Sequence, residues 1–173
     1  EARAPGVRLV GATNRPTSDV TGCGAAAQQG GSVEISASLL SGNSACGLLV
    51  HRASGLVLRT VIRANAHEIG KGGGGGGGEP FSDGVMAFEA DSLRVETSLV
   101  EGHPRNGLLL VDCPVVSLSS CLVTANGVGI GTQGAHKATS YGVAAMGNTS
   151  QNTAGVSGLS IPPPMAPASP KDD

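Results

Sequence analysis

Short apolar segments of similar sequence recur along this chain. Residues 84–87 (GVMA) return 23 residues later as residues 107–110 (GLLL), and residues 24–27 (GAAA) return after the same interval as residues 47–50 (GLLV). Within the repeat, apolar residues alternate with polar ones, which is the two-residue period of a strand that buries one face. A short unit that cannot bury this face alone is typical of a solenoid, in which stacked copies complete a common core.

Aligned at a step of 23 residues, the repeats form columns of like residues. The columns expected to face inward are Val33, Leu56, Leu93 and Val116, then Ile35, Leu58, Val95 and Leu118, then Leu39, Ile62, Leu99 and Leu122, and, on another strand, Ala25, Leu48, Val85 and Leu108 followed by Ala27, Val50, Ala87 and Leu110. The columns expected to face solvent are Glu34, Val57, Arg94 and Ser117, then Ser36, Arg59, Glu96 and Ser119. Each period thus holds about three short strands, as in one coil of a parallel β-helix.

Two other repeat architectures fit the pattern less well. Helical solenoids have units of roughly 33 to 47 residues with long segments of 3.6-residue periodicity, and neither feature is present here. Leucine-rich repeats have a suitable length, but their fixed L-x-x-L-x-L-x-x-N pattern is missing. We therefore predict an all-β fold, a single-stranded parallel β-helix of about five to six coils.

The β-helix is predicted to cover residues 1–161, with two early departures from the regular step. Its first coil is degenerate, and Val7 and Leu9 are expected to supply the alternating pair there. An insertion at about 64–83 contains seven consecutive glycines, and we expect it to be a flexible tract at a corner, where added residues cost little. A phosphate-binding loop would instead need its glycines around a Lys-Ser/Thr pair that opens a helix.

The pattern weakens toward the end of the chain. A sixth, weaker coil is expected through about Ile161, in which Thr139, Tyr141, Ala145 and Met146 fall one period after Val116, Leu118, Leu122 and Val123. Residues 162–173 begin with three prolines, which donate no backbone hydrogen bond. This last segment is predicted to be an extended tail.

Composition agrees with a narrow aliphatic core. The 173 residues include two Phe, one Tyr and no Trp, whereas stacked Val, Leu, Ile, Ala and Ser fill the interior of a β-helix. A formal net charge of -2 gives no electrostatic basis for binding nucleic acid. No run of 18 apolar residues is present, so no membrane insertion is predicted.

The ends of the chain point to partners. The chain opens on Glu1 without the pattern of a signal peptide, and we expect it to be a piece of a longer polypeptide. A parallel β-helix has an open strand edge at each end, which must be capped or continued. The expected partners are further coils of the same polypeptide or other protein chains at these ends, and polysaccharide is a further candidate ligand.

The four cysteines fall into two groups. Cys23 and Cys46 occupy one column, and coils about 4.7 to 4.9 Å apart lie within the Cα separation that a disulfide tolerates. A disulfide and two free thiols stacked at a corner both fit this arrangement. Cys121 is expected to face inward in a column with Ser38, Val61 and Ser98, and Cys113 lies elsewhere in the same coil. No C-x-x-C spacing is present, so neither a metal site nor a cofactor is predicted.

One outward column carries the candidate chemistry. It comprises Gln29, Arg52, Glu89 and Asp112, so the two carboxylates lie on adjacent coils. A retaining glycosidase uses paired carboxylates at about 5 Å, one of which has a pKa raised by the other. Glu89 and Asp112 are therefore the catalytic candidates, although a solvated polar face explains them equally simply.

The recurrent form in residues 91–113 and 114–126 resembles the right-handed parallel β-helix proteins of the pectate-lyase-like superfamily, over residues 7–161. The glycine-rich insertion and proline-rich end are similar to tracts in secreted or surface proteins of GC-rich bacteria and to tracts in GC-rich algae. This resemblance implies a right-handed helix and an extracellular or cell-surface location. It carries over no functional residue, because the calcium-binding, arginine and paired-aspartate motifs of the enzymes have no counterpart here.

Fold alone does not choose among the activities of this superfamily, which includes enzymes, adhesins and proteins without chemistry. We expect a non-enzymatic structural or interaction module, a rigid rod within a surface protein or a larger assembly. The alternative is a carbohydrate-binding or polysaccharide-cleaving domain.

Overall fold

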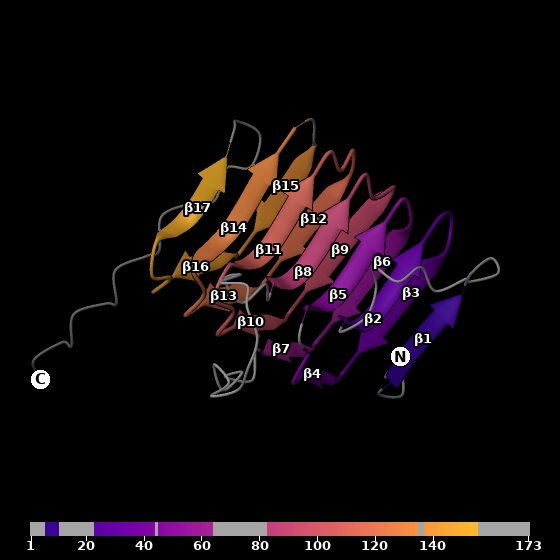
Figure 1. Cartoon of the computed structure of the whole chain (residues 1–173), viewed down its shortest axis with the longest axis horizontal. Coiled ribbons are helices and arrows are strands. Elements are labelled where there is room, and N and C mark those ends of the chain that lie inside the picture. The colour runs from indigo at the N-terminus through magenta and orange to yellow at the C-terminus, as the bar shows by residue number, and fades with distance from the viewer. Residues whose placement is uncertain (1–5, 11–22, 44, 64–82, 135–136, 156–173) are drawn as a thin grey trace, which may run out of the picture.

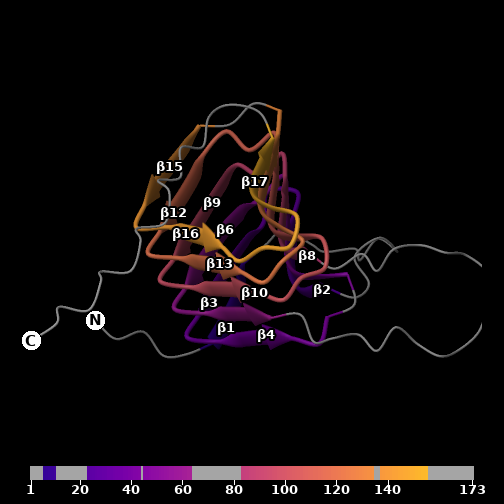
Figure 2. The same cartoon turned by 90° about the vertical axis from the view of Figure 1, so that its left-hand side faces the viewer.

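The chain forms three β-sheets that run along a rod (Figures 1 and 2). The computed structural model describes residues 6–10, 23–43, 45–63, 83–134 and 137–155, and within these ranges it contains strands and turns but no helix. The strands are β1 (Gly6–Val10), β2 (Cys23–Gln28), β3 (Ser32–Ser36), β4 (Leu39–Ser41), β5 (Cys46–His51), β6 (Ser54–Leu58), β7 (Val61–Arg63), β8 (Asp83–Phe88), β9 (Ser92–Glu96), β10 (Leu99–Glu101), β11 (Asn106–Val111), β12 (Val116–Ser119), β13 (Leu122–Thr124), β14 (Val128–Gln133), β15 (Ala138–Tyr141), β16 (Ala144–Met146) and β17 (Gln151–Gly155).

The three sheets are called A, B and C. Sheet A has the order β1-β3-β6-β9-β12-β15, sheet B the order β17-β14-β11-β8-β5-β2, and sheet C the order β16-β13-β10-β7-β4. Each coil passes through sheet B, then sheet A and then sheet C. Coil 1 comprises β2 to β4, coil 2 β5 to β7, coil 3 β8 to β10, coil 4 β11 to β13 and coil 5 β14 to β16, and β17 begins a further passage through sheet B. Figure 2 shows these coils stacked on one another. The prediction of an all-β parallel solenoid with a repeat of about 23 residues is confirmed.

The core is a continuous stack of aliphatic side chains from all three sheets. Leu108 and Leu110 have no exposed surface, and Val116 and Leu118 are 1% exposed, as the alternation predicted. The two predicted columns of sheet B are also confirmed, because Ala25, Leu48, Val85 and Leu108 pair in register from β2 to β11, as do the residues two places later. Burying such a side chain contributes about 1.5 to 3 kcal/mol, which each coil gains only with its neighbours in place.

A glycine stands second in each of the sheet B strands from β2 to β14, and at three of these positions sheet C approaches sheet B closely. A Cβ atom on Gly84 would overlap Cγ1 of Val100, and one on Gly107 would overlap Cγ1 of Val123. Gly47 meets Ile62 in the same way. The repeated glycine is therefore a packing requirement of the narrow core.

Many strands end at a corner residue in the left-handed conformation. Between sheets B and A these residues are Gln29, Arg52, Glu89 and Asp112, with φ between 45° and 49°. The left-handed region is unfavourable for residues other than glycine. The corners are held by bonds between coils, such as the one from the Glu89 amide to the carbonyl oxygen of Val111, at 2.8 Å.

The predicted register of coil 2 is wrong by one residue. Val33 pairs with Gly55 and Ile35 with Val57, so Gly55 and Val57 face inward while Leu56 and Leu58 face outward. The corner before β6 has two residues, 52–53, whereas the corresponding corner of coil 3 has three, 89–91. Because strand side chains alternate with a period of two, one missing residue exchanges the faces assigned by a constant step.

The inward column predicted for sheet C is correct at Ile62, which has no exposed surface, and wrong at its other three positions. Leu39 is 60% exposed and Leu122 is 38% exposed, and both lie in an outward row with Val61 and Leu99. The inward residues are the next ones along each strand, Leu40, Ile62, Val100 and Val123. Each strand carries two adjacent apolar residues, so hydrophobicity did not show which of the two faces the core.

The last coil is shifted by one residue as well. Ala138 pairs with Val116 and Ser140 with Leu118, so Thr139 and Tyr141 do not continue the inward columns, and Tyr141 is 80% exposed. The corner before β14 has three residues, 125–127, against four in coil 3, 102–105. Ala145 faces inward as predicted, at 4% exposure, whereas Met146 faces outward.

The first strand differs in direction from the prediction. β1 pairs antiparallel with β3, and Val7 lies opposite Ile35 and Leu9 opposite Val33, so β1 is not part of a parallel coil. β1 therefore covers the free edge of β3 with a strand of reversed direction. A further coil could not pair with β1 in the parallel register that joins the other coils. The predicted insertion, apart from Asp83, and the predicted tail at 162–173 lie outside the described residues.

Candidate functional site

The predicted acidic column forms one edge of the rod, at the corner between sheets B and A. Gln29, Arg52, Glu89 and Asp112 occupy equivalent corner positions, and each backbone amide donates to a carbonyl oxygen of the next coil. The structure therefore stacks Glu89 between Arg52 and Asp112, in the order expected from the sequence.

Glu89 is bound by Arg52 and its pKa is lowered. The Arg52 Nε donates to the Glu89 Oε2 at 2.5 Å, and both side chains are more than half exposed, at 60% and 51%. The hydrogen bond from Arg52 is the largest cause of the lowered Glu89 pKa, and it raises the pKa of Arg52 in turn. The pKa of Glu89 is thus lowered by its arginine neighbour, which is the opposite of the raised pKa that the general acid of a carboxylate pair needs.

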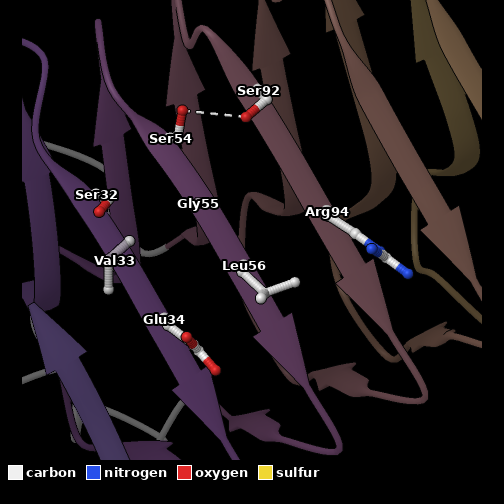
Figure 3. A pocket seen from close by; sticks show the side chains of 8 residues that line it. All are labelled: Ser32, Val33, Glu34, Ser54, Gly55, Leu56, Ser92 and Arg94. Atoms are coloured by element: carbon white, nitrogen blue, oxygen red, sulfur yellow. Dashed lines mark hydrogen bonds between the residues drawn. The ribbon is translucent and has the colours of Figure 1, made fainter. Parts of the chain in front are cut away.

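The outer face of sheet A carries a shallow groove of about 370 Å³ (Figure 3). Three serines, one each from β3, β6 and β9, line one part of the groove, and the Ser92 hydroxyl donates to the Ser54 oxygen at 3.1 Å. Glu34 and Arg94 lie on the outer strands, with Leu56 between them on β6. Arg94 is also paired with Glu96 on its own strand, at 2.5 Å.

This groove depends on the register of coil 2. Because the corner before β6 is one residue short, Leu56 and Leu58 stand level with Arg94 and Glu96 of the next coil. The floor of the groove is thus apolar and its margins are polar. The alignment at a constant step had placed Leu56 in the core, so sequence analysis missed the groove.

A buried polar ladder fills the corner between sheets C and B, and the sequence analysis missed it too. The Asn126 Oδ1 accepts from the His103 amide at 2.9 Å, and the Asn148 Oδ1 accepts from the Asn126 amide at 3.0 Å. The Asn126 amide group also donates to the carbonyl oxygen of Val100. His103 and Asn126 are 2% and 0% exposed, so these bonds satisfy backbone groups that water does not reach.

Asp83 extends this network where coil 3 begins. It is 1% exposed, and its Oδ1 accepts from the Asn106 backbone amide at 2.8 Å and from the Asn106 side chain at 2.9 Å. Arg105 lies 3.4 Å from the other carboxylate oxygen. Burial lowers the pKa of His103, and the Asp83 charge opposes that shift only in part. These buried polar groups thus bind one another and the backbone, as a structural network does.

A second internal ladder lies between sheets A and C. In coil 3, Ser98 Oγ accepts from the Thr60 amide at 3.1 Å and donates to the Glu96 carbonyl oxygen. In coil 4, Cys121 Sγ donates to the carbonyl oxygen of Ser119. Cys121 is buried as predicted, but Thr60 rather than Val61 shares its column, because coil 2 is one residue short. Burial raises the pKa of the Cys121 thiol, which opposes formation of a reactive thiolate.

The remaining cysteines join coils or lie in the core. Cys23 and Cys46 are joined by a disulfide between β2 and β5, with Cα atoms 4.6 Å apart. Cys113 is a buried free thiol whose pKa is raised by burial.

Within the described part of the chain, no group of three or more His, Cys, Asp or Glu side chains is placed to hold a metal ion. No helix in those same residues is long and apolar enough to cross a membrane.

Stacked parallel strands, left-handed corners and internal polar ladders together define a parallel β-helix. The family model for the right-handed β-helix region matches residues 8–157, and the chain belongs to this family. Neither a curated protein nor a solved structure matches the chain.

Proposed function

We propose that the chain is a non-enzymatic structural or interaction module, a rigid β-helix within a cell-surface protein or a larger assembly. The pairing of Glu89 with Arg52 is the observation that carries this proposal. A general acid needs a raised pKa, whereas Arg52 lowers the pKa of Glu89. The pairs Arg63–Glu101 and Arg94–Glu96 likewise neutralise charge on their own faces.

The disulfide supports the proposed location. Disulfides persist in oxidising compartments, including the cell surface and the extracellular space. The disulfide between Cys23 and Cys46 joins the first two coils, and such a bond stabilises the folded chain. This supports an extracellular or surface position for the β-helix.

A polysaccharide-cleavage assay tests the proposal. The unaltered chain, Glu89→Gln and Asp112→Asn are incubated with a panel of neutral and acidic polysaccharides, and new chain ends are quantified. We expect no product above the blank from any of the three. Cleavage by the unaltered chain that disappears in both variants would overturn the proposal and identify the carboxylates as catalytic.

Binding of a carbohydrate without cleavage is a second candidate, favoured by the groove of sheet A. The serine hydroxyls, Glu34 and Arg94 offer donors and acceptors to sugar hydroxyls, and Leu56 offers an apolar surface to a sugar ring. The affinity would be modest, because none of the described residues that line the groove is aromatic.

Two matched arginine variants separate this candidate from non-specific binding. Arg94 lines the groove and Arg63 lies on sheet C, and both are more than half exposed and paired with a glutamate. On a glycan array, binding through the groove is lost in Arg94→Ala and kept in Arg63→Ala. Equal binding by the two variants would rule the groove out.

A further inference from the structure

The outer face of sheet B is apolar at its centre, and in the part of the chain that the structure describes its two outward rows carry no acidic or basic residue other than His51. Its residues alternate with the buried columns and so point away from the core. We call them the sheet B face, and they form two rows, Ala26, Leu49, Met86, Leu109 and Gly131, and then Gln28, His51, Phe88, Val111 and Gln133. Figure 1 shows the strands that carry these rows side by side. The outer faces of sheets A and C, in contrast, each carry an arginine–glutamate pair.

The two rows have a nearly symmetrical order about β8. The first row places a small residue at each end, a leucine next on each side and Met86 at the centre. The second row places a glutamine at each end and Phe88 at the centre. Met86, Phe88, Leu109 and Val111 are half-buried, and Leu49 is 9% exposed. An apolar centre with polar ends is the composition of a protein–protein interface.

A two-fold axis along β8 would bring this face onto the same face of a second copy. Such an axis reverses the order of the coils and preserves the position along each strand. The central residues Met86 and Phe88 then meet their own counterparts, Leu49 meets Leu109 of the second copy, and the two glutamines meet at the rim.

The charges beside this face agree with the same axis. The next residue along each strand is the corner column, with Arg52 in coil 2 and Asp112 in coil 4. Reversing the order of the coils puts Arg52 of one copy level with Asp112 of the other, twice in the pair. Glu89, which follows β8, then faces Glu89 of the second copy, and the Arg52 bound to each Glu89 offsets this repulsion. The corner column thus contributes two opposite-charge pairs and one pair of arginine-bound carboxylates.

The size of the face limits the strength of the contact with a second copy. The five strands of the sheet B face, at about 4.8 Å per strand and six residues of about 3.3 Å each, give a flat area of roughly 480 Å², and side-chain relief increases the accessible surface. Because a standard interface buries roughly 800 Å² per partner, a weak and reversible dimer is expected. Sheet C, with five three-residue strands, offers only about 240 Å² by the same calculation.

We propose that the sheet B face is a self-association surface through which two copies of this chain pack face to face with their coils in opposite order. This inference concerns a different face from the groove of sheet A and holds whatever that groove binds. Its occupant is a second copy of the chain, and the interface is isologous.

Sedimentation velocity of the full chain at low to high micromolar concentrations tests the proposal. We expect a reversible dimer whose association weakens at least tenfold in Met86→Glu and in Leu109→Glu, because each places a charge in the apolar centre. Val115→Glu is the matched control, since Val115 is 53% exposed at a corner outside this face and its replacement leaves the dimer intact. Circular dichroism verifies that every variant is folded.

A short bis-maleimide crosslinker locates the contact. Packed sheets lie about 10 Å apart, which is within the reach of the crosslinker but too far for a disulfide. Met86→Cys is expected to give a crosslinked dimer, and Leu122→Cys on sheet C, 38% exposed, is not. A monomer at every concentration, a dimer that persists in Met86→Glu, or a cysteine at position 86 that maleimide does not reach in the native chain would each overturn the proposal.

Discussion

Coil 2 and coil 3 pass through the same three sheets, yet they present different chemistry on the outer face of sheet A. β6 turns Leu56 and Leu58 outward where β9 turns Arg94 and Glu96 outward. The difference arises from one residue in the corner before each strand. Stacking fixes the inward side chains, so a change of length is absorbed at a corner, and the outward residues that result can differ freely.

The largest effect is expected from a charge placed on the inner side of β6, and the same charge on the outer side of that strand is the comparison. Val57 has no exposed surface, so Val57→Asp buries a carboxylate without a partner and should cost several kcal/mol, about 4 or more. Leu56→Asp adds a charge to a solvated face and should change stability by about 1 kcal/mol or less. Urea unfolding measures both, and similar losses at the two positions would contradict the assigned faces.

A smaller but still large effect is expected inside coil 4. Leu118→Ala should destabilise the fold by about 2 to 5 kcal/mol, because it leaves a cavity between stacked coils. Arg94→Ala removes an exposed ion pair and should cost about 1 kcal/mol or less. Comparable losses in thermal unfolding at these two positions would mean that inside and outside are misassigned.

The covalent link distinguishes the first two coils from the others. Replacing both Cys23 and Cys46 with serine releases a loop of 23 residues and should lower the unfolding free energy by about 3 kcal/mol. Hydrogen exchange should show the loss of protection concentrated in β2, with β8 and β11 protected as before. Unchanged stability in the double variant would show that the two residues are not bonded in the folded protein.

The histidine of the polar ladder should make stability depend on pH. Its folded pKa is lowered, so the unfolded chain binds the proton first, and stability falls as the pH drops below about 6.5. The Ile62 carbonyl oxygen near the ring and the charge of Asp83 limit this loss. His103→Asn supplies the residue found at Asn126 and Asn148 and should remove this component. Urea titrations at about pH 7.5 and 5.5 compare the two chains, and an equal pH dependence would exclude His103 as its source.

The smallest effect is expected from restoring the missing corner residue. A glycine inserted between Ala53 and Ser54 gives coil 2 a three-residue corner and leaves every strand in register, so stability should change by about 1 kcal/mol or less. A glycine inserted after Val57 instead lies within β6 and displaces its inward residues. Thermal unfolding of the two insertions should separate them clearly, and equal tolerance would show that β6 is not held by stacking.

The sequence predicted the fold because sheet B repeats a strict pattern, a glycine followed by inward residues such as Leu108 and Leu110. It failed where the pattern is ambiguous. In coil 2 residues 56–58 are all apolar, so a missing corner residue left no visible mark, and the adjacent apolar pairs of sheet C fit either face. The antiparallel direction of β1 is also invisible, because alternation is the same in both directions.

The candidate column was placed correctly, but the sequence did not show which neighbour binds Glu89. Gln29, Arg52, Glu89 and Asp112 stack as the repeat predicted, since a corner position is fixed by the coils around it. Which neighbour Glu89 meets depends on side-chain direction, which no spacing encodes. The signal for the polar ladder was present, because Asn126 follows His103 at the 23-residue step.

Labelling of single cysteines in β6 tests the assigned faces most directly. The native background is low, because Cys23 and Cys46 are bonded and the other two thiols are buried. In the native protein, Leu56→Cys is predicted to react with maleimide rapidly, and Val57→Cys only after unfolding. Rapid reaction at position 57 with protection at position 56 would contradict the register of coil 2, and with it the origin of the groove on sheet A.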